Sequence, residues 1–335
     1  MAVGSANNVT RSLSSSTPRD NTLSDDSITI NDLRYLHHWL KGSSLFDDHD
    51  PEESRKHADH LMELAFSYRY LLHTILSIAA LDMFDKHRQT IQYYEHAVQH
   101  NSNAIRHARP NMTRSDAEHS EALFNFSALT SLFAFAEPPL RRLQRKQEAH
   151  HDLLDDLLDA FRMGKGNRAV MSCHAESLTE VKQTNDKRWS VDTDSTKSTL
   201  ELEYPQLARL RDMVRTSCDN QRQTGTCFIA LQELFENISA LSKHSGNHSS
   251  AYIIMTWASN LDPVFMDMCE ARHPVALVIL GHYAVMIHLR RAMWFFALWP
   301  RLLLTYTRKR LPSAFDHYLD WPAETLEYCS TTRAE

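Results

Sequence analysis

The sequence predicts an all-α protein, a single large domain of about 10–12 helices in a bundle or solenoid-like arrangement. Glycine is scarce, with 7 among 335 residues, or about 2% against a typical ~7%. β-rich folds need glycine in tight turns and bulges, and nucleotide-binding α/β folds need it where the backbone meets phosphate. Apolar residues recur at helical spacing along most of the chain, and no stretch keeps the alternation of a strand.

The N-terminal half is expected to begin with a disordered tail over residues 1–30, which is rich in serine, threonine and asparagine. The helical domain is expected over residues 31–325. Its first helices are predicted over 31–42, 52–68, 70–84, 88–108, 115–136 and 140–163. In the first of them we expect one buried face, formed by Leu33, Leu36, Trp39 and Leu40.

Breaker residues set two of these boundaries. Pro138 and Pro139 follow a nearly charge-free run, and proline lacks the N–H that a continuing helix needs, so this helix is predicted to end at Ala136. Gly164 is predicted to end the next helix. Residues 165–203 are polar and mixed in charge, which predicts a linker with one short helix over 170–182.

The C-terminal half is predicted to hold helices over 205–218, 226–243, 250–261, 263–272, 274–289 and 302–311. The helix that begins at Pro274 is apolar, but it contains His282 and His288 and stops at Arg290. It is short for a membrane span of ~20 residues, and extending it would bury arginines. We therefore expect a buried core helix and no membrane span.

The charge balance gives no reason to expect a polyanionic partner, because the net charge is −6 and the pI is about 6.4. Local basic clusters occur at 141–146 and 308–310; they are typical of solvated helix faces, with a nuclear-import signal as the alternative. The 5 cysteines are widely spaced and form no CxxC pair, which indicates a reducing compartment. No secretory signal is recognisable in the first 30 residues.

Three motifs with chemical potential are weak when taken singly. Asp155, Asp156 and Asp159 fit the DDxxD pattern of metal-dependent terpene synthases, although no second metal motif follows and an exposed acidic face looks the same. The run 164–169 fits G-x-G-x-x-A, but a helix rather than a strand precedes it, so we interpret it as a helix end and turn. Histidine pairs at helical spacing, 57/60 and 96/100, are interpreted as structural; we expect no metal site and no cofactor.

Aromatic and methionine residues gather after residue 250, where four of the 6 tryptophans lie. Such a wall suits a large apolar ligand, and it suits an ordinary helical core equally well. Composition does not distinguish the two.

A family resemblance goes further. The segment 273–286, which reads HPVALVILGHYAVM, resembles a stretch of the fungal-specific transcription factor domain, and more narrowly of sterol-uptake-control-type zinc-cluster regulators. Trp294, Trp299, Phe315 and Trp321-Pro322 follow it as the family pattern does. In the N-terminal half, the segments 36–39, 73–81 and 121–127 also occur in the order of that family, so the resemblance covers roughly residues 31–325.

The resemblance implies an all-helical regulatory domain whose C-terminal helices form a hydrophobic pocket, which binds sterol in the sterol-sensing members. It implies these wall residues of a ligand pocket: Trp257, His282, Tyr283, Met286 and Trp294. Family members carry a six-cysteine zinc cluster before this domain, whereas residues 1–30 here contain no cysteine. We therefore expect DNA contact only through a partner protein, with a homo-oligomer left open.

Two functions follow as hypotheses. The first is a nuclear transcription regulator that controls lipid, sterol or secondary-metabolite genes through a sterol- or terpenoid-like ligand. The second is a stand-alone enzyme or binding protein, nuclear or cytoplasmic, that holds a terpenoid or polyketide intermediate in the same pocket, with His282 and His288 as candidate acid or base. Under the first hypothesis no residue is catalytic.

Overall fold

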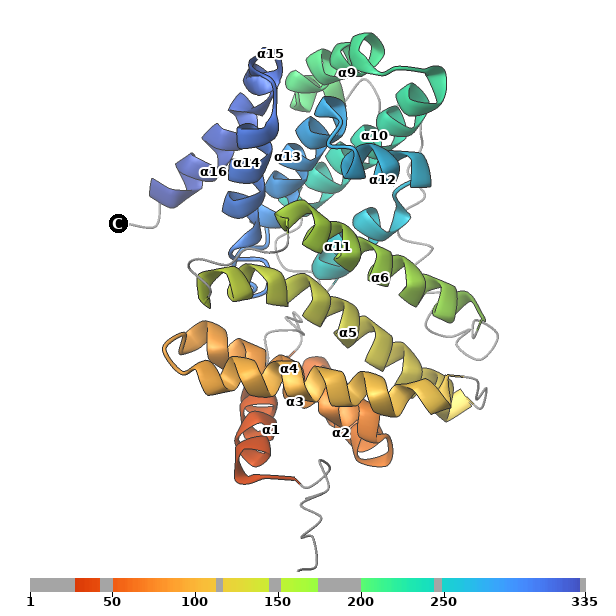
Figure 1. Cartoon of the computed structure of the whole chain (residues 1–335), viewed down its shortest axis with the longest axis vertical. Coiled ribbons are helices and arrows are strands. Elements are labelled where there is room, and N and C mark those ends of the chain that lie inside the picture. Colours follow the sequence, from red (N-terminus) through yellow and green to blue (C-terminus); the bar gives the residue numbers. More distant parts are fainter. Residues whose placement is uncertain are drawn as a thin grey trace, which may run out of the picture.

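The computed structural model describes residues 28–42, 51–112, 117–144, 152–173, 200–243 and 249–331. Within these ranges the chain forms fourteen α-helices and two short 3-10 helices and no strand, so the predicted all-α fold is confirmed (Figure 1). The predicted tail up to residue 27 and the part of the predicted linker over 174–199 lie outside the described residues. One continuous hydrophobic core runs from Tyr35 to Leu326.

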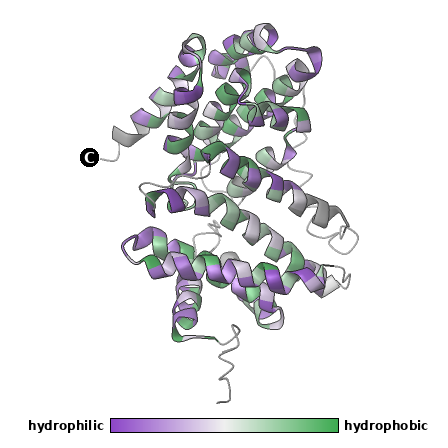
Figure 2. Cartoon of the chain, in the orientation of Figure 1, coloured by the Kyte–Doolittle hydropathy of each residue, from purple (hydrophilic) through white to green (hydrophobic). Residues whose placement is uncertain are grey.

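The N-terminal layer, at the bottom of Figure 1, is built on a pair of long helices. Its elements are α1 (Ile30–Gly42), α2 (Pro51–Ser67), α3 (Arg69–Lys86), α4 (Ile91–Ala108) and the 3-10 helix η1 (Arg109–Asn111). α3 is buried on most faces, as predicted, and α4 packs along it through the fully buried Ala97 and Ala104. α4 carries hydrophilic and hydrophobic residues side by side in Figure 2, which is typical of a helix with one buried face.

Two long helices cross the middle of the molecule. They are α5 (Ala117–Gln144), which lies on α3, and α6 (Leu153–Cys173), which packs on α5. On its other side α6 contacts α11 and α12, so this pair joins the N-terminal layer to the C-terminal helices (Figure 1).

The C-terminal half is arranged around one central helix. Its elements are α9 (Gln206–Ser217), α10 (Gln221–Lys243), α11 (Ser249–Asn260), α12 (Pro263–Glu270), α13 (Pro274–His288), α14 (Trp299–Arg310), α15 (Ser313–Asp316), η2 (His317–Leu319) and α16 (Asp320–Thr331). α13 contacts α10, α12, α14 and α16, and every residue from Val275 to His288 is buried. The prediction of a buried core helix here is confirmed. Among the described residues, none of the helices combines the length and hydropathy that crossing a bilayer requires.

The prediction for the buried face of α1 is correct for Trp39 and Leu36, which pack on the core, and wrong for Leu33 and Leu40. Leu33 and Leu40 are more than half exposed, whereas Asp32, Tyr35 and Trp39 face the protein. Polar bonds to the α3–α4 pair fix this rotation, and each of them involves a histidine: Asp32 accepts from His100 Nε2 at 2.9 Å, Tyr35 bonds to His96, and His38 bonds to Asp82 at 2.6 Å. Hydrophobicity alone cannot reveal a helix face that is fixed by such bonds.

The predicted helix end at Ala136 is also wrong, because α5 continues through Pro138 and Pro139 to Gln144. Pro139 has no N–H to donate to the carbonyl of Phe135, which is its normal partner four residues earlier. The indole Nε1 of Trp299 donates to that carbonyl instead, at 2.7 Å, and its ring packs on Phe135. A side chain from the first turn of α14 therefore replaces the missing backbone donor.

The helix end predicted at Gly164 is likewise wrong, since α6 runs through it to Cys173. A Cβ at Gly164 would lie 2.4 Å from Oγ of Ser259 in α11. This glycine therefore serves the close approach of α6 and α11, and the G-x-G-x-x-A run begins within a helix.

We expect Trp299→Phe to destabilise the protein more than Trp257→Phe. Both indoles are buried, and both donate to a helical carbonyl, Trp257 to that of Ala230 at 3.1 Å. Ala230 keeps its backbone donor in α10, whereas Phe135 is left without one, which should cost about 1–3 kcal/mol more. Chemical denaturation of the two variants measures the difference, and equal losses would contradict the role given to Trp299.

Candidate functional site

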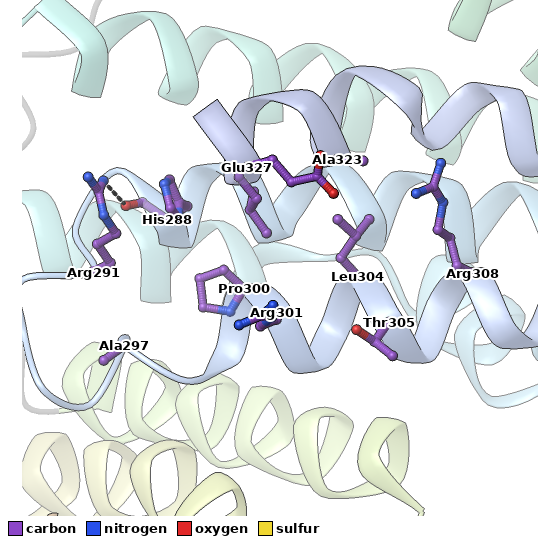
Figure 3. Close-up of a pocket in the computed structure, with 11 residues that line it drawn as sticks. His288, Arg291, Ala297, Pro300, Arg301, Leu304, Thr305, Arg308, Ala323 and Glu327 are labelled. Carbon is purple, nitrogen blue, oxygen red and sulfur yellow. Dashed lines mark hydrogen bonds between the residues drawn. The ribbon is translucent and has the colours of Figure 1, made fainter. Parts of the chain in front are cut away.

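A cleft of about 530 Å³ opens where the end of α13 meets α14 and α16 (Figure 3). His288, the last residue of α13, lines it together with Arg291 and Ala297 from the connection to α14. This volume lies within the range of small-molecule sites, roughly 300–1,000 Å³. The cleft is the candidate functional site among the described residues.

The helix α14 provides the floor of the cleft. One face of it lines the space, and the contributing residues are Pro300, Arg301, Leu304, Thr305 and Arg308. Ala323, Leu326 and Glu327 line it from α16. Residues three to four positions apart share a helix face, so each helix presents aliphatic and charged groups together to the cleft.

The charges of the cleft are unevenly compensated. Arg308 contacts Asp316 at 3.3 Å and Asp320 at 3.2 Å. Arg291 donates to the backbone carbonyl of His288 at 3.2 Å (Figure 3), and no ion pair is found for it or for Arg301 among the described residues. Two arginines of the cleft are therefore available to a ligand.

His288 is the titratable group of the cleft with a strongly altered environment. Its side chain is buried, and Nε2 has no hydrogen-bond partner within the described part of the chain. Burial, with a smaller contribution from the Arg291 charge, lowers the pKa of His288 to about 4. The imidazole is therefore neutral at pH 7.

The predicted wall residues Trp257 and Tyr283 lie in the filled core. Their rings stack with centroids 4.7 Å apart. The Tyr283 hydroxyl donates to the carbonyl of Ile254 at 3.3 Å, and the Trp257 indole is bonded to α10. Each ring is therefore held by its own partners on α10, α11 or α13.

His282 is also held inside the core. Its Nδ1 lies 2.9 Å from the carbonyl of Val278, one turn earlier, and must donate to it. Its ring packs against Phe235 and stacks on Trp321, 5.7 Å from each. Nε2 has no partner in the described chain. Burial lowers the pKa of His282 to about 4.

The remaining two predicted wall residues, Met286 and Trp294, are buried as well. None of the five predicted residues is among those that line the cleft. The structure brings Trp257 and Tyr283 together, whereas His282 lies in a separate group with Phe235 and Trp321. Contact of the five residues with a ligand stays a prediction. Sequence reasoning missed Arg291, Arg301 and Glu327, although arginines spaced along one face of α14 were visible.

Each DDxxD aspartate contacts an arginine, although Asp155 and Asp159 remain more than half exposed. Asp155 contacts Arg272 at 2.6 Å, Asp156 contacts Arg141 at 2.7 Å and Arg142 at 2.8 Å, and Asp159 contacts Arg162 at 2.5 Å. Because each carboxylate already has a cation, the arrangement favours a structural role over a magnesium site.

The predicted histidine pairs are structural where they are described. His60 contacts Glu121 at 2.8 Å, and His96 and His100 bond to α1. The side chain of His57 lies outside the described residues. No group of three or more histidine, cysteine, aspartate or glutamate side chains suited to a metal ion is found in the described ranges.

Comparison of the chain with models of protein families, with curated proteins and with solved structures finds no match in any of the three. The resemblance to the fungal regulatory domain therefore stays a prediction.

We expect the free energy of unfolding to fall on acidification, in part because of His282. Its folded pKa of about 4 lies below the ordinary 6.5, so the folded state favours the neutral ring. This contribution is complete above pH 6.5 and is lost between pH 6.5 and about 4, approaching about 3 kcal/mol.

Chemical denaturation across this pH range checks the expectation. His282→Gln should flatten the pH dependence, whereas His317→Gln, at an exposed position, should leave it unchanged. A wild-type slope retained in His282→Gln would contradict it.

Proposed function

We propose that the described helices form the regulatory domain of a transcription regulator of the fungal zinc-cluster class, which binds a hydrophobic small molecule and acts in the nucleus. The ligand is a sterol-, terpenoid- or other lipid-like molecule, and the controlled genes serve lipid or secondary metabolism. The observation that carries the proposal is the cleft where α13, α14 and α16 meet. It lies at the end of the segment in which the resemblance is strongest.

The pairing of the basic clusters supports a sensing role rather than a DNA-reading role for these helices. Arg141 and Arg142 contact Asp156, Arg308 contacts Asp316 and Asp320, and Arg310 contacts Asp152. Arginines already bound to carboxylates are poorly placed to neutralise phosphates. In the proposal, DNA contact is made through a partner protein.

The position of the cleft also supports a regulatory role. Its floor helix α14 begins at Trp299, which bonds to α5, and its roof α16 packs on α13. A ligand that binds one arrangement of α14 and α16 more tightly than another would shift the population of the two arrangements. Such a shift reaches α5 through the Trp299 bond.

A second function, catalysis on a bound metabolite, is favoured by His288. The imidazole of His288 is neutral and lines the cleft, which makes it the candidate base, although a pKa of about 4 makes it a weak base and its Nε2, unpartnered in the described chain, is buried. In this alternative the chain is a stand-alone enzyme or binding protein for a hydrophobic intermediate.

Filling the cleft should abolish regulation. Ala297 is exposed and lines the cleft, whereas Ala292 is exposed in the same connection and does not line it. In the native host, Ala297→Trp should reproduce the transcript changes caused by gene deletion, and Ala292→Trp should not. Transcript profiles that deletion leaves unchanged would refute the regulator. The comparison of the two variants requires that both match the wild-type melting temperature.

The catalytic alternative makes a different prediction. The purified chain, incubated with a metabolite extract of the host, should consume one component, as followed by mass spectrometry. His288→Gln should slow this consumption by about 100-fold or more, the contribution typical of a general base, while His317→Gln should not. An extract left unchanged by the wild-type chain would rule out the alternative.

A further inference from the structure

The cleft contains charged groups that have no ion pair in the described chain. The charge of Arg308 is compensated by Asp316 and Asp320. In the described chain no ion pair is found for Arg291, Arg301 or Glu327, which all line the cleft. Arg308 and its two aspartates together carry one negative charge, so the cleft with its ion pairs has no net surplus. Among the described residues of the cleft, Arg291 and Arg301 are the cations without a carboxylate partner, and Glu327 is the anion without a cation.

The polar and apolar groups of the cleft are ordered along its length. In Figure 3, His288 and Arg291 lie at one end and Arg308 at the other, with Pro300, Arg301 and Leu304 between them. Leu326 and Ala323 of α16 complete the apolar surface. The Nε2 of His288 has no partner in the described chain, but it is covered by protein, so a ligand reaches it only if the side chain turns toward the cleft.

We infer that this cleft binds a monocarboxylate with an apolar body, its carboxylate held by Arg291 and Arg301 beside His288 and its body on Leu304 and Leu326. The inference rests on the proposed function, because both place the ligand here. An arginine guanidinium matches a carboxylate in geometry and forms charge-assisted bonds to it. The aliphatic side chains remove the body of the ligand from water.

Glu327 decides between a carboxylate and a more highly charged headgroup. Its carboxylate lines the same cleft, from α16. A phosphate monoester carries up to two negative charges at pH 7, so Glu327 would repel it more strongly than it repels a carboxylate with one charge. A neutral alcohol or ester would leave Arg291 and Arg301 without a charged partner.

The test uses the full chain and three probes that share one alkyl chain: decanoate, methyl decanoate and decyl phosphate, each below its micellar concentration. Isothermal titration measures their affinities. Decanoate should bind about tenfold or more tightly than the other two, and its affinity should fall as salt rises.

Variants then assign the carboxylate to its partners. Arg301→Gln should weaken decanoate binding about tenfold or more and leave methyl decanoate unchanged. Arg209→Gln, an exposed arginine of α9 outside the cleft, should change neither. Glu327→Gln should raise the affinity for decyl phosphate more than that for decanoate, because it removes the repulsion of a second charge.

Three results would overturn the inference. They are equal binding of decanoate and methyl decanoate, tighter binding of decyl phosphate, and decanoate binding that Arg301→Gln leaves intact. If methyl decanoate binds equally well and Ala297→Trp abolishes its binding, the carboxylate assignment fails while the proposed ligand site stands. If no probe binds, the inference fails, and the transcript profiles of Ala297→Trp decide the proposed function independently.

Discussion

The organising constraint of the C-terminal half is that α13 has no hydrophilic face. A helix buried from Val275 to His288 must be covered on every side, which α10, α12, α14 and α16 do. Each large aliphatic side chain buried in this way contributes about 1.5–3 kcal/mol. Burial on every side also keeps His282 and His288 neutral. The buried run ends with the helix at His288, which lines the cleft. The core and the candidate site are thus two parts of one helix.

Those parts of the fold that depend on local pattern could be predicted from the sequence. The scarcity of glycine predicted the helical class, and the apolar run after Pro274 predicted α13 as a core helix. The errors arose where a distant residue decides the local structure. The rotation of α1 depends on histidines of α4, and the continuity of α5 depends on Trp299. No window of sequence contains both partners of such a bond.

The site was harder to predict than the fold for a related reason. Buried aromatic residues have the same sequence pattern in a filled core and in the wall of a pocket. Trp257 of α11 and Tyr283 of α13 were predicted to line a pocket, but they stack on each other in the core. The cleft combines one residue from the end of α13 with faces of two further helices, of which α16 follows α14 only after α15 and η2. Arg301 and Glu327 have ordinary surface patterns, and only the packing of α14 beside α16 brings them to one cleft.

The Trp299 bond to Phe135 has a consequence for the growing chain. The indole that completes α5 lies 164 residues beyond the carbonyl it serves. At about 5–20 residues per second, the ribosome delivers it roughly 10–30 s after Phe135. During that interval no indole is present to donate to the Phe135 carbonyl. The nascent helix is therefore expected to break at Pro138 and Pro139, as the local sequence predicts. The continuous α5 is a late product of synthesis.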